Sequence, residues 1–381
     1  MNFENLRNSY IALIKPIDYL KINLQNSVTI NSPLRVNLSA GWNDTPPYCN
    51  EVSGYTLNAP ILLNNKFPIE VRIHKIAENK ILFKNLDTNT SISVNYMNEL
   101  LDCQTPNVPF SLHKASVLAS GLLPYDIHFN LNLFFKKFGG FEMITSVKGI
   151  PIGSGLGTSS ILLHSCIKAI YRFCNLQTSE IDLFHMTACA EQIMTTGGGY
   201  QDQIGAYCKD FKFITFHPGI YPEITCENLQ LNTVLKNELQ DRLAYVYTGN
   251  TRVAKDLLQK IMGSYIRKNP NTIKTLHEIG IVAKNMKGNL LSSDLVSFAK
   301  NMAKSFDLNV QLNPSFTNEN IQNLLHCLKD LIDGYMLSGA GNGGFMTIIL
   351  KDGVSKKKLN DFINLNFKNS KIRLYDFQLY F

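Results

Sequence analysis

The chain has 381 residues, of which 45% are hydrophobic and 18% are charged, and its formal net charge is +7. This composition excludes an intrinsically disordered chain, and the length suffices for one large hydrophobic core or two ordinary ones. The positive charge is spread along the sequence, which argues against a nucleic-acid-binding protein and suits a small polyanionic ligand such as ATP.

The eight cysteines contain no C-x-x-C pair, and several lie in apolar helical stretches, so we expect reduced thiols in a core. There is no run of about 18 apolar residues, and therefore we expect neither a membrane span nor a membrane partner. The first residues, Met1 to Lys21, lack the apolar centre of a secretory signal. Together these features predict a cytoplasmic protein; they do not predict its oligomeric state.

The first part of the chain alternates between apolar and polar residues after a short helical lead-in. Leu34, Val36 and Leu38 alternate with polar residues and predict a strand that ends at the Ala40-Gly41 break. Apolar spacing over residues 112–122 predicts a helix. Further strands are expected at residues 69–73, 81–83, 92–94, 127–133 and 141–147.

Residues 151–160 read Pro-Ile-Gly-Ser-Gly-Leu-Gly-Thr-Ser-Ser and open an apolar helical stretch that runs to Phe173. Glycines let a backbone approach a ligand closely, and the N–H groups at a helix start attract anions. The segment therefore predicts a cradle for nucleotide phosphates, with a glycine-rich turn and a hydroxyl cap as the alternative. A Walker A loop is excluded because no Lys follows the glycines, and the glycine spacing fits a dinucleotide fingerprint poorly.

The second part of the chain is expected to form helices from residue 179 to about 194 and over most of 250–334, with strands at 211–216 and 243–247. Two strands between 335 and 350 would flank a glycine loop at 339–344. A helix at 355–366 and a strand at 372–381 follow. We expect a domain boundary near residue 235, which gives domains 1–235 and 236–381.

Three stretches resemble the motifs of the GHMP small-molecule kinases, the family named for galactokinase, homoserine kinase, mevalonate kinase and phosphomevalonate kinase. They are residues 35–44, 151–160 and 337–345, in the order and at the places that the family expects. Within this family, residues 41–49, 195–203 and 247–252 resemble the L-fucokinases. The resemblance implies an α+β chain with an N-terminal α/β domain of the ribosomal protein S5 domain 2-like type and a ferredoxin-like C-terminal domain.

The resemblance also implies a site for ATP and Mg²⁺. Ser159 and Glu191 take the places of the metal ligands, although Ser159 could be only a helix cap and Glu191 only a surface carboxylate. Glu191 precedes Asp202 by eleven residues, as the metal-binding Glu precedes the catalytic Asp in mevalonate-kinase-like members. The residues expected to contact the nucleotide are Pro151, Gly153, Ser154, Gly155, Leu156, Gly157, Thr158, Ser159, Ser160, Gly339 and Gly341.

Asp202 follows three glycines, and by resemblance it is the catalytic base that takes the proton of a sugar hydroxyl. The alternative is a carboxylate that only caps a turn. Arg35 matches the arginine that would hold Asp202 and the charge of the migrating phosphoryl group. Both residues are therefore expected in the catalytic centre.

Asp44 matches the sugar-binding aspartate of galactokinase-like members, nine residues after Arg35. The chain departs from galactokinase at Trp42 and Asn43, where that enzyme has an acid and a His, so galactose itself is not expected. Trp42 would stack on a sugar face, with core packing as the alternative. The full set expected to contact the sugar is Trp42, Asp44, Thr45, Gly199, Tyr247 and Arg252.

The leading hypothesis is an ATP- and Mg²⁺-dependent kinase that phosphorylates the anomeric hydroxyl of L-fucose. A second hypothesis keeps this chemistry and replaces fucose by a heptose 7-phosphate, which would need an additional basic pocket. A third is a sugar sensor without catalysis on the same fold. The presence of Ser159, Glu191 and Asp202 argues against the sensor.

Overall fold

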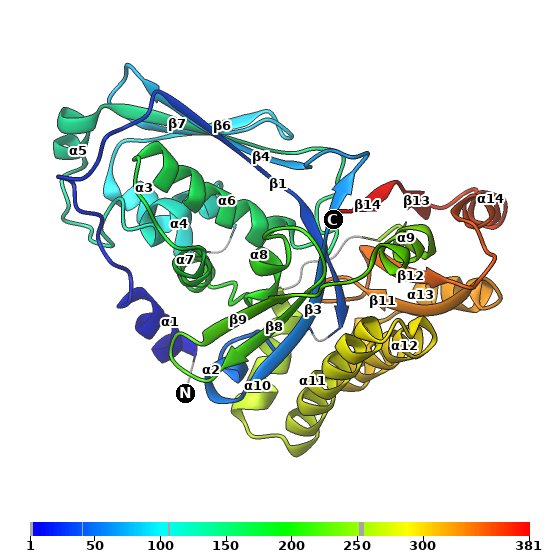
Figure 1. The fold of residues 1–381 in the computed structure, drawn as a ribbon. Helices are drawn as coiled ribbons and strands as arrows, with labels where there is room; N and C mark the ends of the chain where they lie inside the picture. The colour runs from blue at the N-terminus through cyan, green and yellow to red at the C-terminus, as the bar shows by residue number, and fades with distance from the viewer. Residues whose placement is uncertain (1–2, 40, 106, 251–254) are drawn as a thin grey trace. The chain divides into compact units, whose positions relative to one another are not determined.

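The computed structural model describes residues 3–39, 41–105, 107–250 and 255–381 (Figure 1). It divides into two compact units. Unit 1 contains residues 1–32, 67–149 and 158–203, and unit 2 contains 33–66, 150–157 and 204–381. Residue 235 lies inside helix α9 (Thr233–Arg242) of unit 2, and the predicted domain boundary near it stays a prediction. None of the helices in the described ranges is long and apolar enough to cross a membrane.

Unit 1 contains a five-stranded sheet in the order β1-β4-β7-β5-β6. The strands are β1 (Ser27–Ser32), β4 (Ile69–Ile76), β5 (Ile81–Asn85), β6 (Thr90–Val94) and β7 (Gly140–Val147). Neighbouring strands are antiparallel except for β5 and β7, which run parallel. Alternation along β4 buries Ile69, Val71 and Ile73, as the sequence pattern predicts.

Helix α6 (Thr158–Phe173) packs on β1 and β4 and places the residues that follow the glycine-rich segment. Helix α7 (Glu180–Ile193) packs against α6 and is capped by Ser179, whose hydroxyl accepts from the Asp182 N–H. The other helices that contain residues of this unit are α1 (Phe3–Ile11), α3 (Met97–Leu101), the 3₁₀ helix η1 (Asp102–Gln104), α4 (Ser111–Ala119), α5 (Leu131–Phe138) and α8 (Gln201–Gly205), which ends in unit 2.

The strand predicted at residues 127–133 is wrong, because the chain forms helix α5 there. The Asn130 side chain caps this helix by accepting from the Asn132 N–H. Leu131, Phe134 and Phe135 then fall on one buried face at helical spacing. The alternation that suggested a strand ends at the cap.

Unit 2 contains two sheets. One has the order β14-β3-β8-β9 with β2 also paired to β3, and the other has the order β11-β12-β10-β13. The first is built from β2 (Leu34–Ser39), β3 (Gly54–Leu63), β8 (Lys212–His217), β9 (Glu223–Asn228) and β14 (Phe377–Leu379). The second is built from β10 (Leu243–Tyr247), β11 (Ile332–Leu337), β12 (Phe345–Leu350) and β13 (Arg373–Tyr375).

The long helices α11 (Pro270–Leu291) and α12 (Leu295–Leu312) pack on each other, α11 also contacts β3, and α12 contacts β11. Side chains of Asn269 and Asp294 cap their N-termini. The remaining helices of unit 2 are α2 (Tyr48–Glu51), α9, α10 (Lys255–Ile266), η2 (Pro314–Phe316), α13 (Glu319–Leu328) and α14 (Lys356–Asn366). Sheets and helices in both units confirm the α+β class.

Candidate active site

Residues 150–157, the phosphate loop, are part of unit 2. Gly153, Gly155 and Gly157 all have positive φ, which only glycine adopts without strain. A Cβ on Gly155 would lie 2.4 Å from the Ser338 backbone oxygen. Alternating glycines therefore serve both the loop conformation and a close backbone contact.

A second glycine loop, residues 339–344, lies against the phosphate loop. The Phe345 N–H donates to the Ser154 carbonyl oxygen at 2.9 Å, and a Cβ on Gly344 would lie 2.3 Å from the same oxygen. Gly339 also lies close to Gly155, since its Cβ would lie 2.8 Å from the Gly155 Cα. Gly341 instead faces Phe316, so it shapes the second loop rather than the contact between the two.

Arg35 is anchored on the phosphate loop. It lies on β2 with 1% of its surface exposed, and its Nη1 donates to the Gly155 carbonyl oxygen at 2.9 Å. A guanidinium in this position faces the loop that the sequence assigns to phosphates. Arg35 is in unit 2 and Asp202 in unit 1, and their pairing stays a prediction.

Glu191 on α7 is only 4% exposed, so the alternative of a surface carboxylate is wrong. The Ser160 hydroxyl donates to Glu191 Oε1 at 2.6 Å, and the Thr196 hydroxyl bonds Oε2. Burial raises the pKa of Glu191, and the nearby charge of Asp202 adds to the rise while the two hydroxyls oppose it. A Cβ on Gly198 would lie 3.0 Å from the Glu191 Cδ, so the glycine leaves room for the carboxylate.

The oxygen donors around Glu191 fit Mg²⁺, which prefers carboxylate and hydroxyl oxygens and usually keeps waters and substrate phosphates as further ligands. Within the described ranges there is no group of three or more His, Cys, Asp and Glu side chains that could form a metal cage. An ion beside Glu191 would therefore depend on oxygens from a bound nucleotide. Ser159, the other predicted ligand, is exposed in the first turn of α6, whereas the neighbouring Ser160 is the one that bonds Glu191.

Asp202 lies in the first turn of α8, after the glycines at 197–199. It is half-buried, and both its role as a base and the alternative of a carboxylate that only caps a turn stay predictions. Gly199 precedes it by three residues and is also half-buried. The segment thus presents a carboxylate on a short helix directly after a glycine-rich turn.

The segment after α8 has an anchor that sequence reasoning missed. Lys212 on β8 is fully buried, and its Nζ donates to the carbonyl oxygens of Cys208 and Asp210, both at 3.1 Å, and of Gly205 at 3.4 Å. Burial lowers the pKa of Lys212 to about 8, although the charges around it oppose the shift. A polar residue that opens an apolar strand is the signal in the sequence.

Residues 41–47, the sugar loop, carry the predicted substrate contacts Trp42, Asp44 and Thr45. The Trp42 Nε1 donates to Asn309 Oδ1 at 2.9 Å, and the indole, 7% exposed, packs in a hydrophobic cluster with Leu257 and Met262. The ring is therefore a core residue, and its stacking on a sugar stays a prediction.

The sugar loop is also held through its next residue. The Asn43 Nδ2 donates to the Leu276 carbonyl oxygen of α11 at 2.9 Å. Asp44 and Thr45 are both buried. Sequence reasoning missed Asn309 and the role of Asn43 as anchors of this loop.

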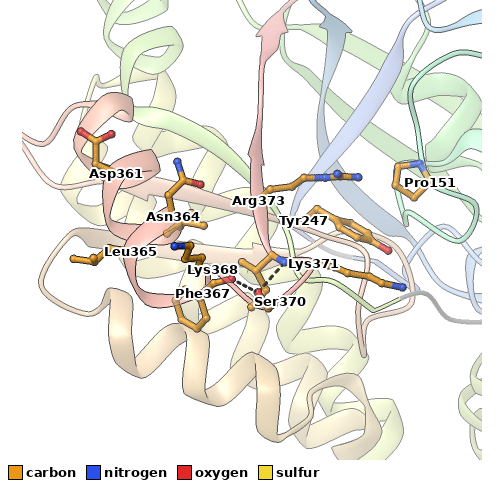
Figure 2. A pocket seen from close by; sticks show the side chains of 12 residues that line it. Pro151, Tyr247, Asp361, Asn364, Leu365, Phe367, Lys368, Ser370, Lys371 and Arg373 are labelled. Atoms are coloured by element: carbon orange, nitrogen blue, oxygen red, sulfur yellow. Dashed lines mark hydrogen bonds between the residues drawn. The ribbon is translucent and has the colours of Figure 1, made fainter.

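Tyr247 ends β10 and lines a cavity of about 1000 Å³ in unit 2 together with Pro151 (Figure 2). The cavity is otherwise lined by α14 and the segment that follows it, residues 361–373. Arg252, the remaining predicted sugar contact, lies outside the described residues.

Comparison with known proteins shows two kinds of similarity. Residues 127–210 match the GHMP kinases N terminal domain. The chain is 30% identical over 351 residues to the L-fucokinase/L-fucose-1-P guanylyltransferase of Bacteroides fragilis, a match that covers 91% of this chain and 37% of that relative. It is 27% identical over 323 residues to the D-glycero-alpha-D-manno-heptose 7-phosphate kinase of Campylobacter jejuni, covering 84% of this chain and 88% of that relative.

Among solved structures, the Streptococcus pneumoniae phosphomevalonate kinase in complex with phosphomevalonate and AMPPNP superposes with a TM-score of 0.67 at 14% identity. The match covers 92% of this chain and 99% of that one. It shows that the two chains share a fold. The chain thus spans about a third of the length of the fucokinase relative and nearly the whole heptose phosphate kinase relative.

Proposed function

We propose that this chain is a member of the GHMP kinase superfamily and transfers the γ-phosphoryl group of ATP to the anomeric hydroxyl of a sugar, with L-fucose as the first candidate. The two-domain α+β fold expected for that superfamily is confirmed by the structural match. The observation that carries the proposal is the backbone contact of the two glycine loops, with Arg35 bonded to the carbonyl of Gly155. That arrangement suits a polyphosphate.

The phosphate loop binds the nucleotide through backbone groups. Its glycines adopt a positive φ without strain, and α6, which begins at Thr158, adds the partial positive charge of a helix N-terminus. Arg35 is fixed at the loop by its bond to Gly155 and stabilises negative charge that develops on the transferring group.

Ser159 and Glu191 would hold Mg²⁺, which when bound would neutralise negative charge on the phosphate oxygens. Ser160 and Thr196 orient the Glu191 carboxylate through their hydroxyls. Burial raises the pKa of Glu191 and favours its protonated form. The two hydrogen bonds oppose this rise and favour the ionised form that a cation requires.

Asp202 orients the sugar hydroxyl and takes its proton at a carboxylate oxygen. The Asp202→Asn variant keeps the size of the side chain but accepts no proton. We expect kcat to fall roughly 100-fold or more with nearly unchanged KM for ATP and sugar. The acidic limb in the pH profile of kcat should disappear as well.

The control for this experiment is Asp352→Asn, an exposed turn residue of unit 2, which should leave the profile unchanged. A large loss of kcat with the acidic limb still present would assign Asp202 to orientation alone. A kcat within about threefold of wild type would contradict both roles.

The acceptor is tested by ADP release with L-fucose, D-galactose and heptose 7-phosphate. We expect the highest kcat/KM with L-fucose. A heptose 7-phosphate is the second candidate, favoured by the basic cavity beside Tyr247 and by the relative that this chain matches over most of its length. Binding of sugar and ATP without ADP release would instead support a sugar sensor.

A further inference from the structure

The cavity beside Tyr247 takes no part in the phosphoryl transfer derived above, and its cationic side chains have not yet been assigned a ligand group. Three cationic side chains, Lys368, Lys371 and Arg373, line it, and Asp361 is its one acidic lining residue. Within the described ranges none of the three cations has a carboxylate partner within ion-pair distance; Arg373 donates to the Tyr375 hydroxyl at 2.8 Å. The lining therefore carries an excess of positive charge.

The cations are distributed unevenly. Figure 2 shows the Arg373 and Lys371 side chains extending toward Tyr247, on the side where Pro151 lies, whereas Asp361 lies at the opposite end of the view. The positive end of the cavity thus adjoins Pro151, which opens the phosphate loop, and Tyr247, which the sequence assigns to the acceptor.

The segment that presents these cations is well defined. The Ser370 hydroxyl donates to the Phe367 carbonyl oxygen at 2.8 Å and accepts from the Ile372 N–H at 3.1 Å, which fixes the turn between α14 and β13. Gly249 lies against this turn, since a Cβ on it would be 3.3 Å from the Lys371 Cβ. The last residue of the Tyr-Thr-Gly motif at 247–249 therefore makes room for the lysine.

The same motif is tied to the phosphate loop. The Thr248 N–H and hydroxyl both donate to the Gly344 carbonyl oxygen at 2.9 Å, and Gly344 packs on Ser154. Burial and the neighbouring Tyr375 raise the pKa of Tyr247 and Arg373 opposes the rise, so the phenol remains a hydrogen-bond donor at neutral pH. One wall of the cavity is thus a continuation of the phosphate-loop scaffold.

We propose that this cavity is a second anion site, in which Lys368, Lys371 and Arg373 bind the phosphate group of a sugar monophosphate. Arg and Lys are the side chains that bind phosphate oxygens. All three cations are exposed, and a ligand phosphate would replace the water around them. A volume of about 1000 Å³ accommodates a sugar ring with its phosphate. The inference rests on the proposed function, because it assumes that the ligand is a sugar.

The test measures binding by titration calorimetry to the full chain, with heptose 7-phosphate, L-fucose 1-phosphate and ADP as probes. The first variant is Lys368→Glu with Lys371→Glu, and its matched control is Lys357→Glu with Lys358→Glu, two exposed lysines of α14 outside the cavity. Both pairs change the net charge equally. The second variant, Arg373→Gln, removes one cation without reversing its charge. It keeps the test valid if the first variant does not fold.

We expect the affinity for at least one sugar phosphate to fall about tenfold or more in both cavity variants and to stay near the wild-type value in the control. If the affinity for heptose 7-phosphate falls, the bound phosphate belongs to an acceptor. If the affinity for L-fucose 1-phosphate falls, it belongs to a product. An equal loss in the control, an equal loss for ADP, or no binding of either sugar phosphate to wild type would overturn the proposal.

Calorimetry requires no turnover, so this proposal and the kinase proposal fail separately. A chain that binds sugar phosphate through these cations but releases no ADP with any sugar would contradict the kinase proposal alone. A chain that phosphorylates L-fucose but shows none of the expected losses of affinity would contradict only the anion site.

Discussion

The phosphate loop and the sugar loop both belong to unit 2, yet opposite means hold them in place. Backbone fixes the phosphate loop, because Gly155 packs on Ser338 and Gly344 packs on Ser154. Side-chain amides fix the sugar loop, through Trp42 to Asn309 and through Asn43 to a carbonyl of α11. One loop depends on the absence of side chains, and the other depends on particular side chains far away in the sequence.

This difference matches the two ligands. In the proposed function, the polyphosphate of ATP is bound mainly through backbone N–H groups, which a glycine-rich loop offers without a special side chain. A sugar is distinguished by the pattern of its hydroxyls, and that requires side chains held in fixed positions. Changes in the first loop should therefore affect ATP, and changes around the second should affect the sugar.

The largest effect is expected for Gly155→Ala. The new Cβ would lie 2.4 Å from the Ser338 oxygen at a φ of +77°. We expect kcat/KM for ATP to fall roughly 100-fold or more, because the loop must move away from the second glycine loop. Steady-state kinetics with varied ATP measures this.

Gly353→Ala is the matched control, since Gly353 has a φ of +73° but no heavy atom within 4 Å of a Cβ. It carries the same backbone strain without the contact, and its ATP kinetics should stay near wild type. ATP kinetics of Gly155→Ala within about twofold of wild type would show that backbone contact does not fix the loop.

A smaller and different effect is expected for Asn309→Leu, which removes the acceptor of the Trp42 indole N–H. We expect the KM for sugar to rise about tenfold with an unchanged KM for ATP, and the free energy of unfolding to fall by about 1–3 kcal/mol, since a buried donor loses its partner. Kinetics with each substrate varied and urea unfolding measure the two quantities.

The control is Asn301→Leu on the same helix, where the Asn301 Nδ2 donates to Asn289 Oδ1 of α11 at 2.9 Å. Asn301→Leu should lower the free energy of unfolding and leave the KM for sugar unchanged. If both variants changed sugar KM equally, the effect would come from the packing of α11 and α12 and not from Trp42.

The smallest effect is expected from two glycines of α11. A Cβ on Gly280 would lie 2.6 Å from Asn43 Oδ1, whereas a Cβ on Gly288 would meet nothing within 4 Å. Gly288→Ala should therefore raise the free energy of unfolding by about 0.5–1 kcal/mol, the usual gain of alanine in a helix. Gly280→Ala should lose that gain and raise sugar KM about threefold.

Thermal unfolding and sugar kinetics of the two alanine variants compare them directly. Equal stabilisation by both substitutions, with unchanged sugar KM, would show that Asn43 has room to move and does not hold the sugar loop.

The same contrast explains what the sequence could predict. Alternating glycines are a local pattern that predicts loops at 151–160 and 339–344, and the family resemblance adds their expected contact with a nucleotide. Glu191 was found through its spacing from Asp202, but its burial was not predicted, because nothing in the sequence pairs it with the hydroxyls of Ser160 and Thr196. The wrong strand at 127–133 shows the limit of alternation where a cap such as Asn130 begins a helix.

Asn309 was missed because its partner Trp42 is 267 residues away. A signal was present, since Phe298, Met302, Ser305 and Asn309 share one buried face of α12. Two polar residues on an otherwise apolar stripe indicate a buried hydrogen-bonding partner, although they do not identify it.

The pairing of β3 imposes an order on the folding of the chain during its synthesis. Residues 61–63 of β3 pair with residues 377–379 of β14, and residues 54–58 pair with β8. A ribosome delivers the chain from its N-terminus, so unit 1 can be complete when residue 203 has emerged. Residues 61–63 of β3, in contrast, remain without β14 until residue 379 has been made. For that time residues 61–63 lack their partner strand, whereas residues 54–58 can pair with β8 once residue 217 has been made. We expect chaperones that bind unpaired strands to meet this protein at residues 61–63.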